Sequence, residues 1–225
     1  MLTPTEHPDA ESWTVVGEIK GRERPDEIVL LGAHLDSWDL GTGATDDGAG
    51  IAIMAGAARL IGALPVHPKR TIRVVLFGAE EMDYSGNAYA KAHEADAGHI
   101  ALAAEADFGS GRAYEMQLPA GAPGTPFAQD LAAALTALGV FEARDPARFA
   151  GSDVAPLQPL GVPVISARQN GLYYFDTHHT ADDTLDKVDP AELAQNVAVW
   201  AATAYLAAET DTDFRAIATA AAATR

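Results

Sequence analysis

The stretch GAHLDSWDLGTGATDDGAG, residues 32–50, holds one histidine and four aspartates around a glycine-rich turn. The apolar run at 28–33 overlaps its start, and such a run is typical of a strand buried on both faces. The acidic side chains therefore emerge from the protein core and not from a surface tail. This arrangement predicts that something positively charged binds beside His34.

Three further segments supply imidazole or carboxylate groups after an apolar run. In open α/β sheets the carboxyl ends of parallel strands lie at one edge, and ligands bind just beyond that edge. We therefore expect the groups that follow these strands to meet at one site. In chain order the candidates are His34, Asp46, Glu80, Glu81, Asp107, His178 and His179.

The mixture of residue types indicates metal chemistry. Imidazole and carboxylate ligands together suit zinc, cobalt or manganese, and a chain without cysteine has no thiolates for a structural zinc site. Two metal ions ~3.5–4 Å apart would need a bridging carboxylate. In the Glu80–Glu81 pair one carboxylate can bind metal while the other takes a proton from water. Asp36, two residues after His34, is placed to hold the second nitrogen of that imidazole.

Strands and helices must alternate to position these groups. Apolar runs predict an edge strand at 13–20 and core strands at 28–33, 71–79, 99–107 and 162–167. Helical spacing of apolar residues predicts helices at 48–64, 85–95, 126–139 and 189–209. The last of these has Asp189 as its N-cap and Pro190 at its first position. This alternation predicts an α/β fold with a mainly parallel sheet.

Composition limits the partners. Fifteen basic and 32 acidic residues give a formal net charge of −17, which argues against nucleic acid or an anionic membrane surface as partner. No apolar run approaches the ~18 residues that a membrane span needs, so we expect no membrane insertion. The first residues also lack the basic and then apolar pattern of a signal peptide.

The motifs resemble a known family. GAHLDSWDLGTGATDDGAG, LFGAEEMDYSGNAYA, EADFG and HHTADDT are similar to the successive motifs of the M28 family of dizinc exopeptidases. The stretch at 151–190 resembles most the carboxypeptidase Q (plasma glutamate carboxypeptidase-like) branch. The resemblance implies a three-layer α/β/α fold around a mainly parallel central sheet, as in zinc exopeptidases.

The resemblance also implies a ligand set for two zinc ions, with Co²⁺ or Mn²⁺ as substitutes. One ion would be held by His34, Asp46 and Asp107. Asp46 would bridge to the second ion, which Glu81 and His179 complete.

Three more residues receive roles from the same resemblance. Glu80 would be the general base and acid, and Asp36 would orient His34. Related enzymes often have a tyrosine before the last histidine, where this chain has His178. We expect His178 to hydrogen-bond the tetrahedral intermediate.

Neighbouring polar residues have other interpretations. We expect Asp182 and Asp183 to form a turn or to hydrogen-bond around the site and not to coordinate metal. Ser152 and Asp153 resemble a family position near the substrate, but a helix N-cap is an equally good interpretation.

The implied activity is hydrolysis of short peptides or dipeptides by metal-activated water, with cleavage from the N-terminus as the expected mode. The sequence leaves open which peptide end is read, because Arg168 could bind a terminal carboxylate. Two other classes also stay open. A glutaminyl-cyclase-like acyltransferase would need a single zinc ion, and a non-catalytic interaction domain of this fold would have lost ligands.

The domain organisation follows from length and loop lengths. We expect one peptidase catalytic domain over 1–225, with a lead-in at 1–12 and a tail at 209–225. The loops between the motifs leave no room for an inserted protease-associated domain. The resemblance implies a periplasmic or secreted parent protein, and a homodimer is a further open alternative.

Overall fold

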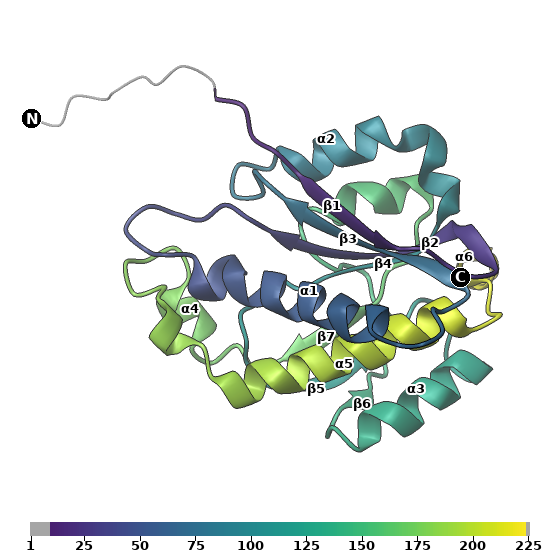
Figure 1. Ribbon diagram of the computed structural model, residues 1–225. Coiled ribbons are helices and arrows are strands. Elements are labelled where there is room, and N and C mark those ends of the chain that lie inside the picture. The colour runs from purple at the N-terminus through teal and green to yellow at the C-terminus, as the bar shows by residue number, and fades with distance from the viewer. Residues whose placement is uncertain (1–9, 224–225) are drawn as a thin grey trace, which may run out of the picture.

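The computed structural model describes residues 10–223, and a four-stranded sheet lies at its centre. Its strand order is β1-β3-β2-β4, made of Val15–Ile19, Arg70–Phe77, Arg24–His34 and Ile100–Glu105. Strand β2 runs parallel to both β3 and β4, and β1 pairs antiparallel with β3 at the edge (Figure 1). The three parallel strands therefore end at the same edge of the sheet, as the sequence predicts.

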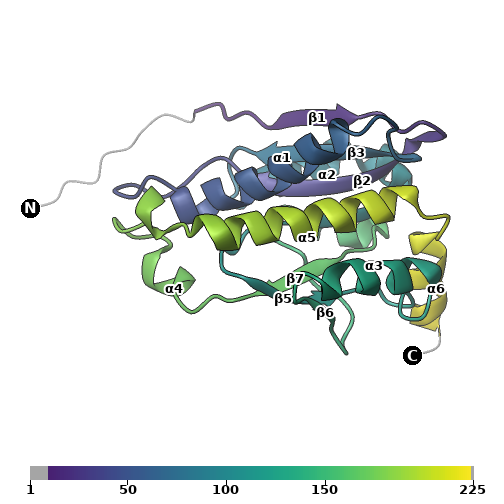
Figure 2. The same ribbon diagram turned by 60° about the horizontal axis from the view of Figure 1, so that its bottom comes forward.

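Helices cover both faces of this sheet. On one face α1 (Ala49–Gly62) packs beside α5 (Pro190–Glu209), as Figures 1 and 2 show. The other face is covered by α2 (Ser85–Ala92) and a short helical turn, Ala155–Leu160.

The central position of β2 in the sheet explains why its run of apolar residues is continuous. Val29 and Leu31 pack into the core on the α1 and α5 side, and Ile28 and Leu30 pack into the core on the α2 side. A strand buried on both faces has no polar alternation. The predicted α/β fold class is confirmed.

A second, three-stranded sheet corrects one prediction. Its order is β6-β5-β7, made of Phe141–Glu142, Ala113–Gln117 and Ser166–Gln169. In the segment 162–167, expected as a fourth core strand, Val164 makes an isolated bridge to Ala103 of β4, and Ser166 and Ala167 belong to β7 of the second sheet. Pro163 can accept but cannot donate in a sheet. The chain then leaves β4 and pairs antiparallel with β5 as β7.

The ends of the helices follow local rules. Asp189 accepts the N–H groups of Ala191 and Glu192, so the predicted cap of α5 is confirmed. Thr125 caps α3 (Pro126–Thr136) in the same way. Helix α4 (Tyr174–Thr177) is a single turn between β7 and α5.

The last segment differs from the expected tail. Residues Phe214–Ala223 form α6, and the buried ring of Phe214 packs edge-on against Phe127 at 4.9 Å. Most of the expected lead-in at 1–12 lies outside the described residues. Over residues 10–223, no helix has both the length and the hydropathy that crossing a membrane requires.

Candidate metal centre

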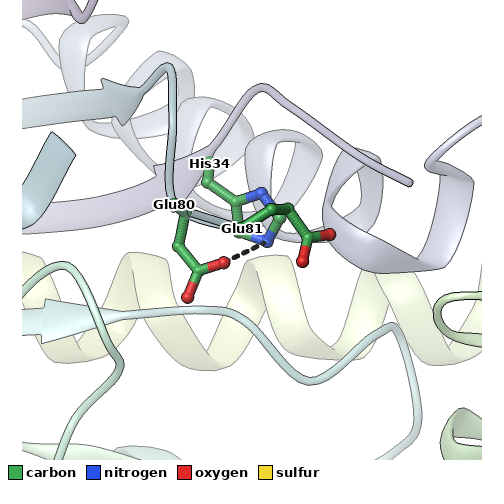
Figure 3. Close-up of side chains that lie close together, drawn as sticks. All are labelled: His34, Glu80 and Glu81. Atoms are coloured by element: carbon green, nitrogen blue, oxygen red, sulfur yellow. Dashed lines mark ion pairs between the residues drawn. The ribbon is translucent and has the colours of Figure 1, made fainter. Parts of the chain in front are cut away.

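The ends of the three parallel strands bring the predicted side chains together. His34 is the last residue of β2, Glu80 and Glu81 lie in the turn after β3, and Asp107 follows β4 by two residues. Asp46 comes from the helical segment Ala44–Gly48 that leads into α1. Figure 3 shows the carboxylate of Glu80 facing the His34 ring, with the carboxylate of Glu81 on the other side of the ring in this view.

One set of ligand atoms surrounds Nε2 of His34. Asp46 Oδ1 lies 3.2 Å from this nitrogen, Asp107 Oδ1 lies 3.4 Å away, and Glu80 Oε2 lies 3.9 Å away (Figure 3). The His34 side chain is fully buried, so bulk water does not screen these charges.

A second set surrounds Nε2 of His179. Asp46 Oδ2 lies 3.1 Å from this nitrogen, and Glu81 Oε2 lies 3.0 Å from it. His179 has φ 58°, in the left-handed region that residues with a Cβ rarely adopt. Strained backbone of this kind clusters at functional sites.

The residues fit divalent cations. Ligand atoms of His34, Asp46 and Asp107 all lie within 4.8 Å of one another, and so do those of Asp46, Glu81 and His179. A third grouping, His34 with Glu80 and Glu81, meets the same limit. Asp46 Oδ2 and Glu81 Oε1 are buried and accept no hydrogen bond from the described residues, although His179 Nε2 lies 3.1 Å from Asp46 Oδ2. A buried carboxylate oxygen without a donor is costly, and a cation would remove that cost.

The shifts in pKa also indicate a site for a cation. Burial raises the pKa of Glu80 and Glu81, and the charges of Asp107 and Asp46 respectively raise it further. Burial also raises the pKa of Asp107, although His34 opposes this. For His34 burial lowers the pKa, but the carboxylates that it contacts outweigh burial and raise the pKa on balance. Negative charge is therefore in excess at this place.

Asp36 connects the first histidine to the glutamate pair. Its two carboxylate oxygens accept the backbone N–H groups of Glu80 and Glu81 at 3.0 and 3.1 Å. The closest Asp36 atom to Nδ1 of His34 is the main-chain oxygen, at 3.0 Å, and the carboxylate lies at 3.6 Å. Asp36 thus contacts the second nitrogen of His34, and its carboxylate bonds mainly to the glutamate turn.

Asp183 holds the segment that carries Asp46. Its Oδ1 accepts from the backbone N–H and the hydroxyl of Thr45 at 2.6 and 2.7 Å, and its Oδ2 accepts from Asp46 N–H at 3.1 Å. Asp182 is exposed in a turn. Both residues therefore act as the sequence predicts, by hydrogen bonds and not as members of the two ligand sets.

His178 lies beside the centre without joining either set. Its ring stacks on that of Tyr174 at 4.7 Å between centroids and lies 4.5 Å from the ring of His179. Its Nδ1 is buried and has no hydrogen-bond partner among the described residues. The hydrogen bond expected from His178 to an intermediate stays a prediction.

Two residues at the centre are absent from the sequence-based set. Trp38 donates its indole N–H to Glu81 Oε2 at 2.5 Å, and its ring lies 5.4 Å from that of His179. Asp47 is buried and accepts the N–H groups of His34 and Gly50. Both residues belong to the acidic stretch 32–50, so their proximity to His34 in the chain was the available signal.

Comparison with known proteins gives these observations a context. The chain matches peptidase family M28 over residues 14–204. It is 36% identical over 204 residues to carboxypeptidase Q of Rattus norvegicus, an alignment covering 90% of this chain and 43% of the relative. The chain thus spans less than half the length of this curated relative.

Solved structures agree with the fold. A peptidase M28 precursor from Shewanella amazonensis SB2B is 49% identical with a TM-score of 0.85, covering 89% of this chain and 45% of that chain. An aminopeptidase from Aneurinibacillus sp. strain AM-1 is 25% identical with a TM-score of 0.67, covering 89% and 49%. The fold, the convergent acidic and histidine side chains and the family match lead to one conclusion: this chain belongs to peptidase family M28.

Proposed function

We propose that this chain is the catalytic domain of a zinc-dependent exopeptidase that hydrolyses short peptides or dipeptides. The observation that carries the proposal is the position of Asp46, whose two oxygens face His34 and His179 separately. Each imidazole has one further carboxylate within 3.4 Å, from Asp107 and Glu81 respectively. Membership of family M28 and relatives named as a carboxypeptidase and an aminopeptidase support it.

Two zinc ions fit the two sets of ligand atoms. In this proposal His34, Asp46 and Asp107 hold one ion, and Asp46, Glu81 and His179 hold the other. Co²⁺ or Mn²⁺ can replace zinc in such a ligand set. When bound, the metal ions supply Lewis-acid polarisation of the scissile carbonyl and make water more acidic.

Glu80 is the proposed general base. Its carboxylate borders the first ligand set, 3.9 Å from Nε2 of His34. Burial and the nearby charge of Asp107 raise its pKa, which suits a group that takes a proton and later returns it. Glu80 removes a proton from the attacking water and delivers it to the leaving amine. His178 donates a hydrogen bond to the oxyanion from its position beside His179.

Two cations that line cavities near the centre already have carboxylate partners. A cavity of about 470 Å³ opens at Asp107, and its cation Arg168 already pairs with Glu115 and Asp145 at 2.8 and 2.6 Å. A second cavity of about 360 Å³, on the α4 side, contains Lys187, which pairs with Asp186. A terminal carboxylate would therefore find each of these two cations already neutralised. We propose cleavage from the N-terminus.

Metal content is the first test. The chain is purified without chelator, supplied with excess zinc, desalted and analysed for zinc by elemental analysis. About two zinc ions per chain support the proposal, in line with a bridged two-metal site. One ion supports the cyclase-like alternative, and none contradicts a metal-dependent function.

Peptides with a blocked terminus test whether the enzyme recognises the N-terminus or the C-terminus of its substrate. The rate of hydrolysis of a free tripeptide is compared with that of its N-acetylated form and of its C-terminal amide. Cleavage from the N-terminus predicts that acetylation abolishes hydrolysis and that the amide is still cleaved. The reverse result would make the chain a carboxypeptidase.

We further propose that the protein acts in the periplasm or after secretion, as the family likeness suggests. Fractionation of the native host with an antibody against this chain tests the location. Sedimentation of the purified chain tests whether it forms a homodimer.

A further inference from the structure

Helix α2 begins directly after the turn that carries Glu80 and Glu81, yet its own N-cap residue, Tyr84, makes no side-chain capping bond. Asp153 supplies the acceptor from a distant part of the chain. Its Oδ1 accepts the hydrogen bond of the Ser85 hydroxyl at 2.8 Å. Ser85 is the first residue of α2, so this bond joins the start of the helix to Asp153. Asp153 therefore holds the start of α2 from outside the helix.

Ser85 links this hydrogen bond to the start of the turn. The Ser85 hydroxyl accepts the backbone N–H of Ala79 at 3.3 Å, and the Ser85 N–H donates to the Ala79 carbonyl at 3.2 Å. Ala79 directly precedes Glu80. Both ends of the turn at 79–85 are thus joined to Asp153 through one hydroxyl.

Asp153 is itself held by the strand that leads to Asp107. The N–H groups of Asp153 and Val154 donate to the Glu105 carboxylate at 3.4 and 2.9 Å, and Glu105 is the last residue of β4. Asp153 is only 2% exposed and Glu105 only 6%. The hydrogen bonds therefore run from the end of β4 to the turn after β3 through buried groups.

The loop at 151–154 packs tightly against α2 and against Glu105. A Cβ at Gly86 would lie 2.5 Å from the main chain of Asp153, and a Cβ at Gly151 would lie 2.1 Å from the Glu105 carboxylate. Gly151 has φ 120°, which also favours glycine. The loop at 151–154 therefore packs tightly on the start of α2 and on the end of β4.

We infer that Asp153 is a positioning residue, which fixes the Glu80–Glu81 turn relative to Asp107 by holding the Ser85 hydroxyl at the start of α2 from the loop at 151–154. The inference rests on the proposed role of Glu80 in hydrolysis. Asp153 acts through its hydrogen bond to Ser85 and its packing against Gly86, and not on the substrate.

The test compares Asp153→Ala with Asp153→Asn and with Thr125→Ala as a matched control. Thr125→Ala likewise removes one side-chain hydrogen bond at the start of a helix, here α3, where the hydroxyl accepts the Ala128 N–H at 3.3 Å. Hydrogen exchange of segment 79–86, followed by mass spectrometry on the zinc-loaded chain, reports on the turn without any need for activity. Peptide hydrolysis gives kcat and KM for each variant.

Asp153→Ala is expected to speed exchange across 79–86 and to lower kcat by about 10- to 100-fold, with KM within about twofold of the parent value. Asp153→Asn keeps an acceptor oxygen and restores most of kcat. Thr125→Ala leaves exchange at 79–86 and kcat unchanged. If Asp153→Ala does not fold, as judged by circular dichroism, Ser85→Ala breaks the same link and replaces it.

Parent-like exchange and kcat in Asp153→Ala would overturn the inference. An equal loss of kcat in Thr125→Ala would also overturn it, because loss of any such hydrogen bond would then suffice. If the parent chain hydrolyses no peptide, the proposed function fails. The exchange data still decide in that case whether Asp153 holds the turn.

Discussion

His34 and His179 face opposite oxygens of one carboxylate. Oδ1 of Asp46 lies 3.2 Å from Nε2 of His34, and Oδ2 lies 3.1 Å from Nε2 of His179. The first histidine ends strand β2 and the second follows helix α4. One carboxylate placed between two imidazoles can be shared by two cations, which is the arrangement that a bridged two-metal site needs.

Asp46→Ala should lower the zinc content from about two ions per chain to one or none, because both ligand sets lose a carboxylate. Elemental analysis after desalting measures the content. Asp39→Ala is the matched control, since Asp39 is an exposed aspartate in the same acidic stretch. If the Asp46 variant kept two zinc ions, the bridging assignment would be wrong.

Glu80→Gln should separate catalysis from metal binding. The amide cannot take a proton from water, so kcat should fall by about 10²- to 10⁴-fold. Zinc content should stay at the parent value, because Glu80 lies outside the two proposed ligand sets. Glu81→Gln provides the contrast, with an expected loss of zinc. Hydrolysis at the parent rate in Glu80→Gln would rule out Glu80 as the base.

Asp183→Ala should destabilise the fold by about 2 kcal/mol or more, because it leaves the buried N–H groups of Thr45 and Asp46 without their acceptor. Urea denaturation of the zinc-free chain measures this loss. Asp182→Ala changes the neighbouring, exposed aspartate and should have little effect on stability. Equal losses in the two variants would show that the contacts of Asp183 are not the cause.

The ion pair between Glu209 and Arg22 should make the stability of the fold depend on pH. The Glu209 carboxylate forms a bidentate ion pair with the Arg22 guanidinium, with hydrogen bonds of 2.6 and 2.7 Å. The hydrogen bond from Arg22 is the largest cause of the lowered pKa of Glu209. A carboxyl group whose pKa is lower in the folded state stabilises the protein above its unfolded-state pKa, and this stabilisation is lost as pH falls through the folded-state pKa.

Glu209→Gln should therefore reduce the free energy of unfolding at pH ~7, and the difference from the parent should shrink below pH ~4. Guanidinium denaturation at several pH values measures the difference. Glu142→Gln, at an exposed position in β6, should show no such trend. A difference that stays constant with pH would contradict the ion-pair explanation.

Much of the fold and most of the candidate site were predictable from the sequence, because their signals are local. Continuous apolar runs marked β2, β3 and β4, and Asp189 followed by Pro190 marked the start of α5. Parallel strands end at one sheet edge, so His34, the Glu80–Glu81 pair and Asp107, which end or follow those runs, had to converge there.

The tertiary structure alone decided features that join distant residues. The departure of the chain from the central sheet after Ile165 goes with the antiparallel pairing of β7 with β5, a strand that is distant from it in the chain. The neutralisation of Arg168 by Glu115 and Asp145 depends on the same second sheet.

Other such features are the hydrogen bonds from Thr45 to Asp183 and from the Ser85 hydroxyl to Asp153. Spacing along the chain predicts what a residue does within its own strand, helix or turn. Contacts between residues that are tens of positions apart form only when the chain closes the loops between them and packs. No local sequence pattern therefore predicts these contacts.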